Sequence, residues 1–115
     1  MANRKQNTNC YIGSDNLVHL ILDNELLGLL SKALMLSLHY FEMYPTEAPL
    51  LYERFLIEET KEVFLKAHTV GKTKVKMLKS QFFYAMHPSN MVFLDEATSA
   101  LVFGLIAPVH NNKNH

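Results

Sequence analysis

The sequence predicts an all-α fold, a compact bundle of about four helices, and three observations carry this prediction. Apolar residues recur at steps of three and four along most of the chain, which is the spacing of one helix face. Residues that cap and end helices divide this pattern into segments. The 115 residues are 49% hydrophobic and 19% charged, which is typical of one globular domain that buries a core without disulfides or a metal.

The first predicted helix extends from Ser14 or Asp15, either of which can cap it, to Tyr44. Its apolar residues form two adjacent rows, so we expect it to lie centrally or to cover its extra face with another chain. Its most apolar stretch, residues 26–41, contains a lysine and has 16 residues. Because crossing a bilayer takes roughly 20 apolar residues, this length favours a buried helix and no contact with a membrane.

The second predicted helix begins after Pro45, which ends the first one, and Thr46 caps it. Its core stripe contains Phe55, Leu56, Val63 and Ala67. It continues to about residue 70, and the glycine that follows is the residue expected to close the last turn in a left-handed conformation.

The triplet Gly71-Lys72-Thr73 has the spelling of the end of a phosphate-binding loop. Such a loop needs another glycine five residues earlier, where Lys66 stands within a helical pattern. We therefore interpret Gly71 as a helix end and not as part of a nucleotide site.

The third predicted helix covers residues 73–86, and a turn follows at His87–Asn90. Residues 91–107 fit two interpretations. The preferred one is a fourth helix capped by Ser89 or Asn90. The alternative is a C-terminal β-hairpin, which would make the fold winged-helix-like.

The chain divides into a flexible N-terminal arm (1–13), a single helical domain (14–108) and a frayed tail (109–115). The arm lacks the apolar run of a secretory signal. The single cysteine, Cys10, cannot form an internal disulfide and fits a reducing compartment. We therefore expect a cytoplasmic location.

Charge is unevenly distributed although the formal net charge is zero. Residues 15–62 hold nine acidic and three basic side chains, whereas residues 63–91 hold five basic side chains and no acid. We name the basic set the lysine edge; its members are Lys66, Lys72, Lys74, Lys76 and Lys79. We expect it to contact a protein partner with an acidic surface, and a face that only meets water is the other interpretation of the same pattern.

Nucleic acid is the alternative partner of the lysine edge, because lysines neutralise phosphates. The lysine edge contains no arginine, the residue that makes the commonest base-specific contact, and the chain as a whole is not basic. Both features disfavour this alternative.

Apolar and aromatic side chains exceed what one stripe per helix can bury. Five of them form a predicted apolar interaction face on the flanks of the helix stripes: Leu36, Tyr40, Tyr44, Phe83 and Tyr84. Exposed apolar patches usually mark interaction sites, and symmetric pairing is the commonest way to cover one. We therefore expect a homodimer, packed through the first helix. A core that uses these side chains itself is the alternative.

Catalytic and metal-binding patterns are weak. Cys10 lies in a polar arm that offers no scaffold for a base, and Ser31 and Ser37 lie in the most apolar helix, where small residues permit close packing. His39 and Glu42 are one helical turn apart, but the sequence contains no Glu-x-x-His, the pair that helix-bundle di-metal sites use. We predict no enzyme, no catalytic residues, no metal site and no cofactor.

These observations together predict a small non-enzymatic regulatory or adaptor protein that acts by protein-protein interaction and self-associates. The first alternative is a DNA-binding transcription regulator of the winged-helix type. A weaker alternative is a helical sensor that binds an apolar ligand between its helices.

Overall fold

A computed structural model describes residues 8–111 of the chain. In this part the elements follow the order β1 (Asn9–Ile12), β2 (Val18–Ile21), α1 (Asn24–Met43), η2 (Pro45–Glu47), α2 (Leu51–Val70), β3 (Lys74–Met77), α3 (Lys79–Ala85), η3 (Pro88–Asn90) and α4 (Glu96–Asn111), where η marks a 3-10 helix. The predicted four helices are present. The prediction of an all-α fold is only partly correct, because a three-stranded antiparallel sheet in the order β1-β2-β3 accompanies the helices.

The predicted helix start at residues 14–15 is wrong, because residues 9–21 form an antiparallel hairpin. Asn16 in its loop has a φ of 65°, in the left-handed region that asparagine tolerates better than most residues. The carboxylate of Asp15 accepts a hydrogen bond from the backbone N–H of Leu17 at 3.1 Å and so stabilises a turn instead of capping a helix.

One face of the sheet packs on the helices. Directly paired residues of neighbouring strands share a face, and the buried face consists of Cys10, Val18, Leu20, Val75 and Met77. The other face holds Tyr11, His19, Lys74 and Lys76 and meets solvent. This alternation with a period of two is the pattern of a half-buried strand.

Helix α1 begins where Asp23 caps it: the Asp23 carboxylate accepts a hydrogen bond from the backbone N–H of Leu26 at 2.8 Å. The first predicted helix therefore starts at this second acidic residue and not at Asp15. It ends at Met43, one residue short of the predicted end, ahead of Pro45.

Helix α2 begins later than predicted. Residues 45–47 form the short helix η2, so Thr46 does not cap α2. The side chain of Glu53 reaches back to accept a hydrogen bond from the N–H of Leu50 at 3.3 Å, which satisfies one of the free donors at the helix start.

The predicted end of α2 at Gly71 is confirmed. Gly71 has a φ of 79°, and the N–H of Lys72 donates to the carbonyl of Ala67 at 2.9 Å. This is the left-handed closure that favours glycine.

The third predicted helix is wrong in its first half. Residues 74–77 form β3, whose residues Val75 and Met77 pair with Leu20 and Val18 of β2. The short helix α3 starts only at Lys79. The pairing that fixes β3 comes from a strand far away in the sequence, so the local spacing of apolar residues could not reveal it.

The prediction of a helix in the C-terminal segment is confirmed, and the alternative hairpin is wrong. Helix α4 starts at Glu96, later than the predicted caps Ser89 and Asn90, which belong to η3. Asp95 caps it instead, with its Oδ1 accepting the N–H of Thr98 at 2.8 Å.

The described residues extend both ends of the predicted domain. Residues 9–12 of the predicted arm form β1, and residues 109–111 of the predicted tail continue α4 beyond Pro108, which lies inside the helix. Val109 is buried in the core. Residues 1–7 and 112–115 lie outside the described part of the chain.

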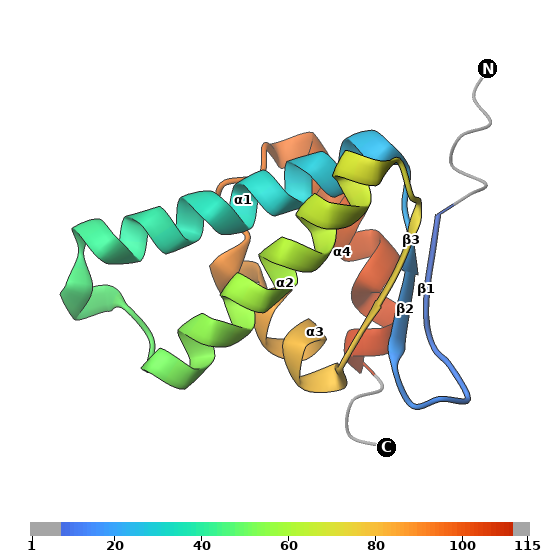
Figure 1. Cartoon of the computed structure of the whole chain (residues 1–115), viewed down its shortest axis with the longest axis horizontal. Helices are drawn as coiled ribbons and strands as arrows, with labels where there is room; N and C mark the ends of the chain where they lie inside the picture. The colour runs from blue at the N-terminus through green and yellow to red at the C-terminus, as the bar shows by residue number, and fades with distance from the viewer. Residues whose placement is uncertain (1–7, 112–115) are drawn as a thin grey trace.

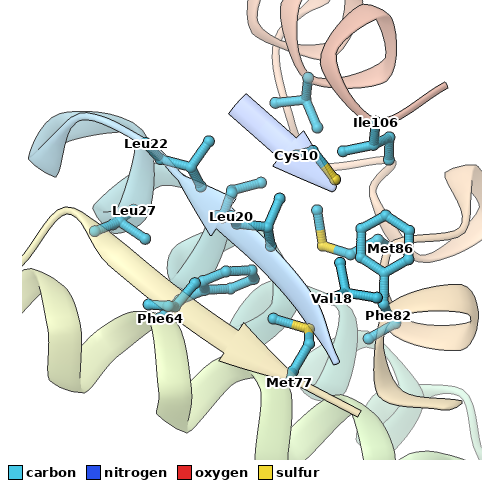
Figure 2. Packing of buried hydrophobic residues seen from close by; sticks show 14 of the residues in the cluster. Cys10, Val18, Leu20, Leu22, Leu27, Phe64, Met77, Phe82, Met86 and Ile106 are labelled. Carbon is cyan, nitrogen blue, oxygen red and sulfur yellow. The ribbon is translucent and has the colours of Figure 1, made fainter. Parts of the chain in front are cut away.

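A single core joins the sheet to all four helices (Figure 2). Leu20, Leu27, Phe64, Phe82 and Ile106 come from β2, α1, α2, α3 and α4, and each is at most 1% exposed. The burial of several such side chains is the main favourable contribution to folding.

The helices and the sheet give the molecule two distinct ends (Figure 1). The sheet lies at one end, on the right of the view, and the turn that joins α1 to α2 projects at the other. Both long helices have 20 residues, so at 1.5 Å per residue each spans about 30 Å.

Candidate interaction surfaces

Four members of the lysine edge follow the chain in a row from the end of α2 through β3 to the start of α3, and the fifth, Lys66, lies on α2. Lys66, Lys72, Lys74 and Lys76 are exposed, and Lys79 is half-buried at the start of α3. Lys74 and Lys76 lie on the solvent face of β3, about 7 Å apart at the rise of a strand. Because β3 is an outer strand of the sheet, these lysines also discourage pairing with a strand of another chain.

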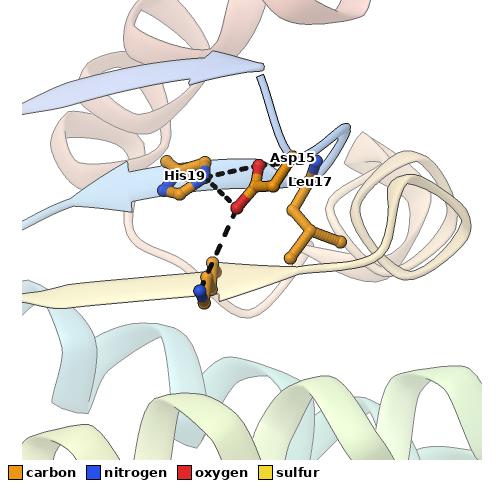
Figure 3. A network of polar contacts seen from close by, with 4 residues as sticks. Asp15, Leu17 and His19 are labelled. Carbon is orange, nitrogen blue, oxygen red and sulfur yellow. Dashed lines mark hydrogen bonds and ion pairs between the residues drawn. The ribbon is translucent and has the colours of Figure 1, made fainter. Parts of the chain in front are cut away.

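A carboxylate lies within reach of this row. Asp15 Oδ2 is 4.0 Å from Lys76 Nζ, and Asp15 Oδ1 is 2.9 Å from His19 Nε2 (Figure 3). The ring of Tyr11 stacks on the His19 ring with centroids 5.0 Å apart. The hydrogen bonds from His19 and from the N–H of Leu17 hold the pKa of Asp15 below its ordinary value. The carboxylate therefore stays charged and weakens the positive potential at this point of the lysine edge.

The five residues of the predicted apolar interaction face do not lie together in the structure. Tyr40 and Tyr84 line one pocket, and Tyr44 lies beside Tyr40 with ring centroids 4.7 Å apart. Phe83 packs instead on the core and on a ring of α4, and Leu36 is half-buried on α1. Only the three tyrosines therefore belong to one region.

The pocket that Tyr40 and Tyr84 share lies between α1, η2, α3, η3 and the segment that follows η3, and it has a volume of about 520 Å³. We call it the aromatic pocket, because four rings line it: Tyr40, Phe41, Tyr84 and Phe93. The centroid of Tyr40 lies 6.1 Å from that of Phe41 and 6.4 Å from that of Phe93, with planes inclined by 70° and 56°. The rings thus form inclined walls and not a flat stack.

Among the described residues that line this pocket, Glu47 is the one with a charged side chain. Its Oε1 accepts a hydrogen bond from the hydroxyl of Tyr40 at 2.6 Å. This bond, which favours the neutral phenol beside the carboxylate, raises the pKa of Tyr40. The pocket therefore combines aromatic walls with one negative charge held at a fixed place.

Buried hydrogen bonds fix the walls of the aromatic pocket. The hydroxyl of Ser37 donates to the carbonyl of Asn90 at 3.0 Å, and the amide of Asn90 donates to the carbonyl of Tyr84 at 2.9 Å. Ser37 and Asn90 are only 3% and 4% exposed. Burial raises the pKa of Tyr84, and the nearby charge of Glu53 adds to this effect. The pocket is thus a preformed feature that joins α1 to α3.

A second surface gathers large apolar side chains where α1 turns into α2. We call it the hairpin tip; its members are Met43, Tyr44, Leu50, Leu51, Tyr52 and Phe55, between 48% and 78% exposed. A shallow pocket beside it is lined by Leu38, Glu42, Arg54 and Glu58 together with Leu51, Tyr52 and Phe55.

Most of the hairpin tip was not predicted from the sequence, which assigned Phe55 to the core stripe of the second helix. Phe55 is 58% exposed, so this assignment is wrong. The buried stripe of α2 contains Phe64 and, four and then three residues before it, Thr60 and Ile57. Phe55 does not lie on this stripe. The choice of Phe64 as the starting point of the stripe depends on its burial, which the structure shows and the spacing of residues in the sequence does not.

Among the described residues, the structure keeps the candidate metal ligands apart and the thiol of Cys10 inside the core. Within residues 8–111 no group of three His, Cys, Asp or Glu side chains is placed to hold a metal ion. Cys10 is buried, and this burial raises its pKa to about 12, so its thiol is protonated at neutral pH. None of the helices in this part of the chain is long and apolar enough to cross a membrane.

No protein-family model, curated protein or solved structure matches this chain.

Proposed function

We propose that this protein is a small non-enzymatic regulatory or adaptor protein that acts by protein-protein interaction and pairs with a second copy of itself. The observation that supports this proposal most is the exposure of the hairpin tip. Large apolar side chains gathered in water are unfavourable, and a contiguous patch of them usually marks an interaction site.

The area of the hairpin tip suits a symmetric pair. On average, well over half of the surface of its six side chains is exposed. A fully exposed large side chain has about 200 Å² of surface, so together the six expose roughly 750 Å² to solvent. A standard interface buries about 800 Å² on each partner. Two tips packed about a twofold axis would supply this area from both sides.

The charges beside the hairpin tip are self-complementary. Arg54 lies between apolar residues of the shallow pocket, and among residues 8–111 no carboxylate forms an ion pair with it. Glu42 and Glu58 line the same pocket, and Glu58 also forms an ion pair with Lys61 at 2.8 Å. In a twofold contact the guanidinium of one copy meets these carboxylates of the other, which favours a second copy over an unrelated apolar partner.

The lysine edge supports a further contact with a protein that has an acidic surface. It lies at the sheet end of the molecule, whereas the hairpin tip lies at the opposite end (Figure 1). Pairing through the tip therefore leaves the lysines open to a partner.

The winged-helix alternative has less support, because α4 stands where its wing was predicted. We propose a cytoplasmic location, which the free thiol of Cys10 fits.

Sedimentation equilibrium of the full chain tests the pairing. We expect the unmodified protein to approach twice its mass of 13.2 kDa as concentration rises. Leu51→Glu should remain at 13.2 kDa, because the charge would be buried at the centre of the contact. A glutamate in the first turn of α2 suits the helix dipole, so the variant should fold normally.

Leu101→Glu is the matched control, because Leu101 is a leucine of α4 that is 56% exposed and lies outside the hairpin tip. It should pair like the unmodified protein. A monomer at every concentration, or equal loss of pairing in both variants, would contradict the proposal.

A further inference from the structure

The aromatic pocket has the chemistry of a cation site. Four aromatic rings line it. The ring centroids of Phe41 and Phe93 lie 6.1 and 6.4 Å from the centroid of Tyr40, and their ring planes are steeply inclined to that of Tyr40. The face of an aromatic ring carries partial negative charge and attracts a cation whose centre lies within about 6 Å of the ring centroid. A group seated in this pocket can therefore contact several rings at once.

Three sources of negative potential surround the pocket. Glu47 lines it, and Glu53 is close enough to contribute to the raised pKa of Tyr84. The carboxyl end of α1 lies beside them, where Tyr40 and its neighbours present the last carbonyl groups of the helix. No basic side chain lies in the last turn of α1 to offset this negative helix end. A cation is therefore favoured over a neutral or anionic ligand.

The aromatic walls limit which cation fits. The Oε1 atom of Glu47 accepts the Tyr40 hydroxyl, and four of the side chains that line the pocket are aromatic rings. A primary ammonium group carries a strong hydration shell, much of which it would have to lose against these rings. A quaternary ammonium has no N–H group and offers methyl groups to apolar walls.

We propose that the aromatic pocket binds a quaternary ammonium group, with Tyr40, Phe41, Tyr84 and Phe93 around its methyl groups and Glu47 as its counter-charge. The volume of about 520 Å³ leaves room for the chain that carries the head group. A free trimethylammonium metabolite and a trimethylated lysine side chain share this chemistry. This proposal does not depend on pairing through the hairpin tip.

A titration of the full chain with choline tests the charge requirement. The matched probe is 3,3-dimethyl-1-butanol, which has the same shape with carbon in place of the charged nitrogen. We expect saturable binding of choline, followed by the NMR signals of the aromatic rings, and binding of the neutral probe at least about tenfold weaker. Equal binding of both probes, or no binding of choline, would overturn the proposal.

Variants test the location of the site. Phe93→Ala should weaken choline binding about tenfold, because it removes one wall. Tyr11→Ala is the matched control, since Tyr11 and Phe93 are both aromatic and both 42% exposed but Tyr11 lies on the sheet. Glu47→Gln keeps an acceptor for the Tyr40 hydroxyl and removes the charge, so it should also weaken binding. Equal effects of Phe93→Ala and Tyr11→Ala would place the ligand elsewhere and contradict the proposal.

The source of the head group is distinguished by a second titration with the acetylated, amidated derivative of trimethyl-lysine. Tighter binding of this derivative than of choline would assign the site to a modified protein. Tighter binding of choline would assign it to a free metabolite. Unmodified lysine in the same derivative should bind at least about tenfold more weakly than trimethyl-lysine, and equal binding of the two would overturn the assignment to a quaternary ammonium.

Discussion

Cys10 illustrates how burial controls the chemistry of a single side chain. It lies on the helix-facing side of β1, within the core cluster. Burial raises its pKa from 9.0 to about 12, because a thiolate loses its hydration there. Only the thiolate is nucleophilic, so the folded protein keeps this residue inert at neutral pH.

The native chain should therefore react very slowly with iodoacetamide at pH 8. With a pKa of about 12 in place of 9.0, the thiolate fraction is lower by roughly a thousandfold. The comparison is a chain with Cys10→Ala and Ser14→Cys, which places the thiol in the exposed hairpin loop. Mass spectrometry of the alkylated product measures both rates. Similar rates for the two thiols would show that Cys10 is not buried.

Residues with a strong backbone preference, such as Pro45 and Gly71, could be read from the sequence, whereas the N-terminal caps and the residues fixed by distant contacts could not. Gly71 was predicted because a left-handed helix end requires a residue like glycine. Phe55 was misplaced because an apolar residue near a stripe is buried only if another element covers it. Within residues 8–111 no other element covers the hairpin tip, and the spacing of residues cannot show that.

The helices were easier to predict than the strands. All four were expected, because apolar residues three and four apart are a local signal. The sheet was missed since each strand has only four residues and the pairing of β2 with β3 connects segments on either side of α1 and α2. In residues 17–27 the apolar residues of the strand are followed directly by those of the helix, so the two patterns look like one helix. The residues Gly13-Ser14-Asp15-Asn16 are typical of a turn, but they were interpreted as a helix cap.

Two glycines allow a direct test of how backbone conformation ends a helix. A Cβ atom added at Gly71 or at Gly104 meets no atom within 4 Å, so neither change creates a clash. Gly71 has a φ of 79°, whereas Gly104 lies inside α4. Gly71→Ala should lower the free energy of unfolding by about 1 kcal/mol or more, because alanine disfavours the left-handed region.

Gly104→Ala should act in the opposite direction. Alanine loses less backbone entropy than glycine in a helix interior, so the free energy of unfolding should rise by about 0.5–1 kcal/mol. Urea denaturation of both variants measures these changes at one pH and temperature. A loss of stability in both would contradict the assignment of residue 104 to a regular helix.

At the scale of the whole molecule, the surfaces are separated by the two long helices. The hairpin tip lies at the free end of α1 and α2, and the lysine edge lies at the sheet (Figure 1). The apolar interaction face predicted from the sequence shares only Tyr44 with the hairpin tip. The rest of the tip depends on which parts of α2 the other helices leave uncovered, and composition does not determine that.

The most direct test of pairing through the hairpin tip is the distance between spin labels in the paired protein. Labels at Thr46→Cys, exposed in η2, should lie close together across the twofold axis, and labels at Lys74→Cys, exposed on the sheet, should lie much farther apart. The buried thiol of Cys10 should not take up label. A shorter distance between the labels at residue 74 than between those at residue 46 would contradict pairing through the tip.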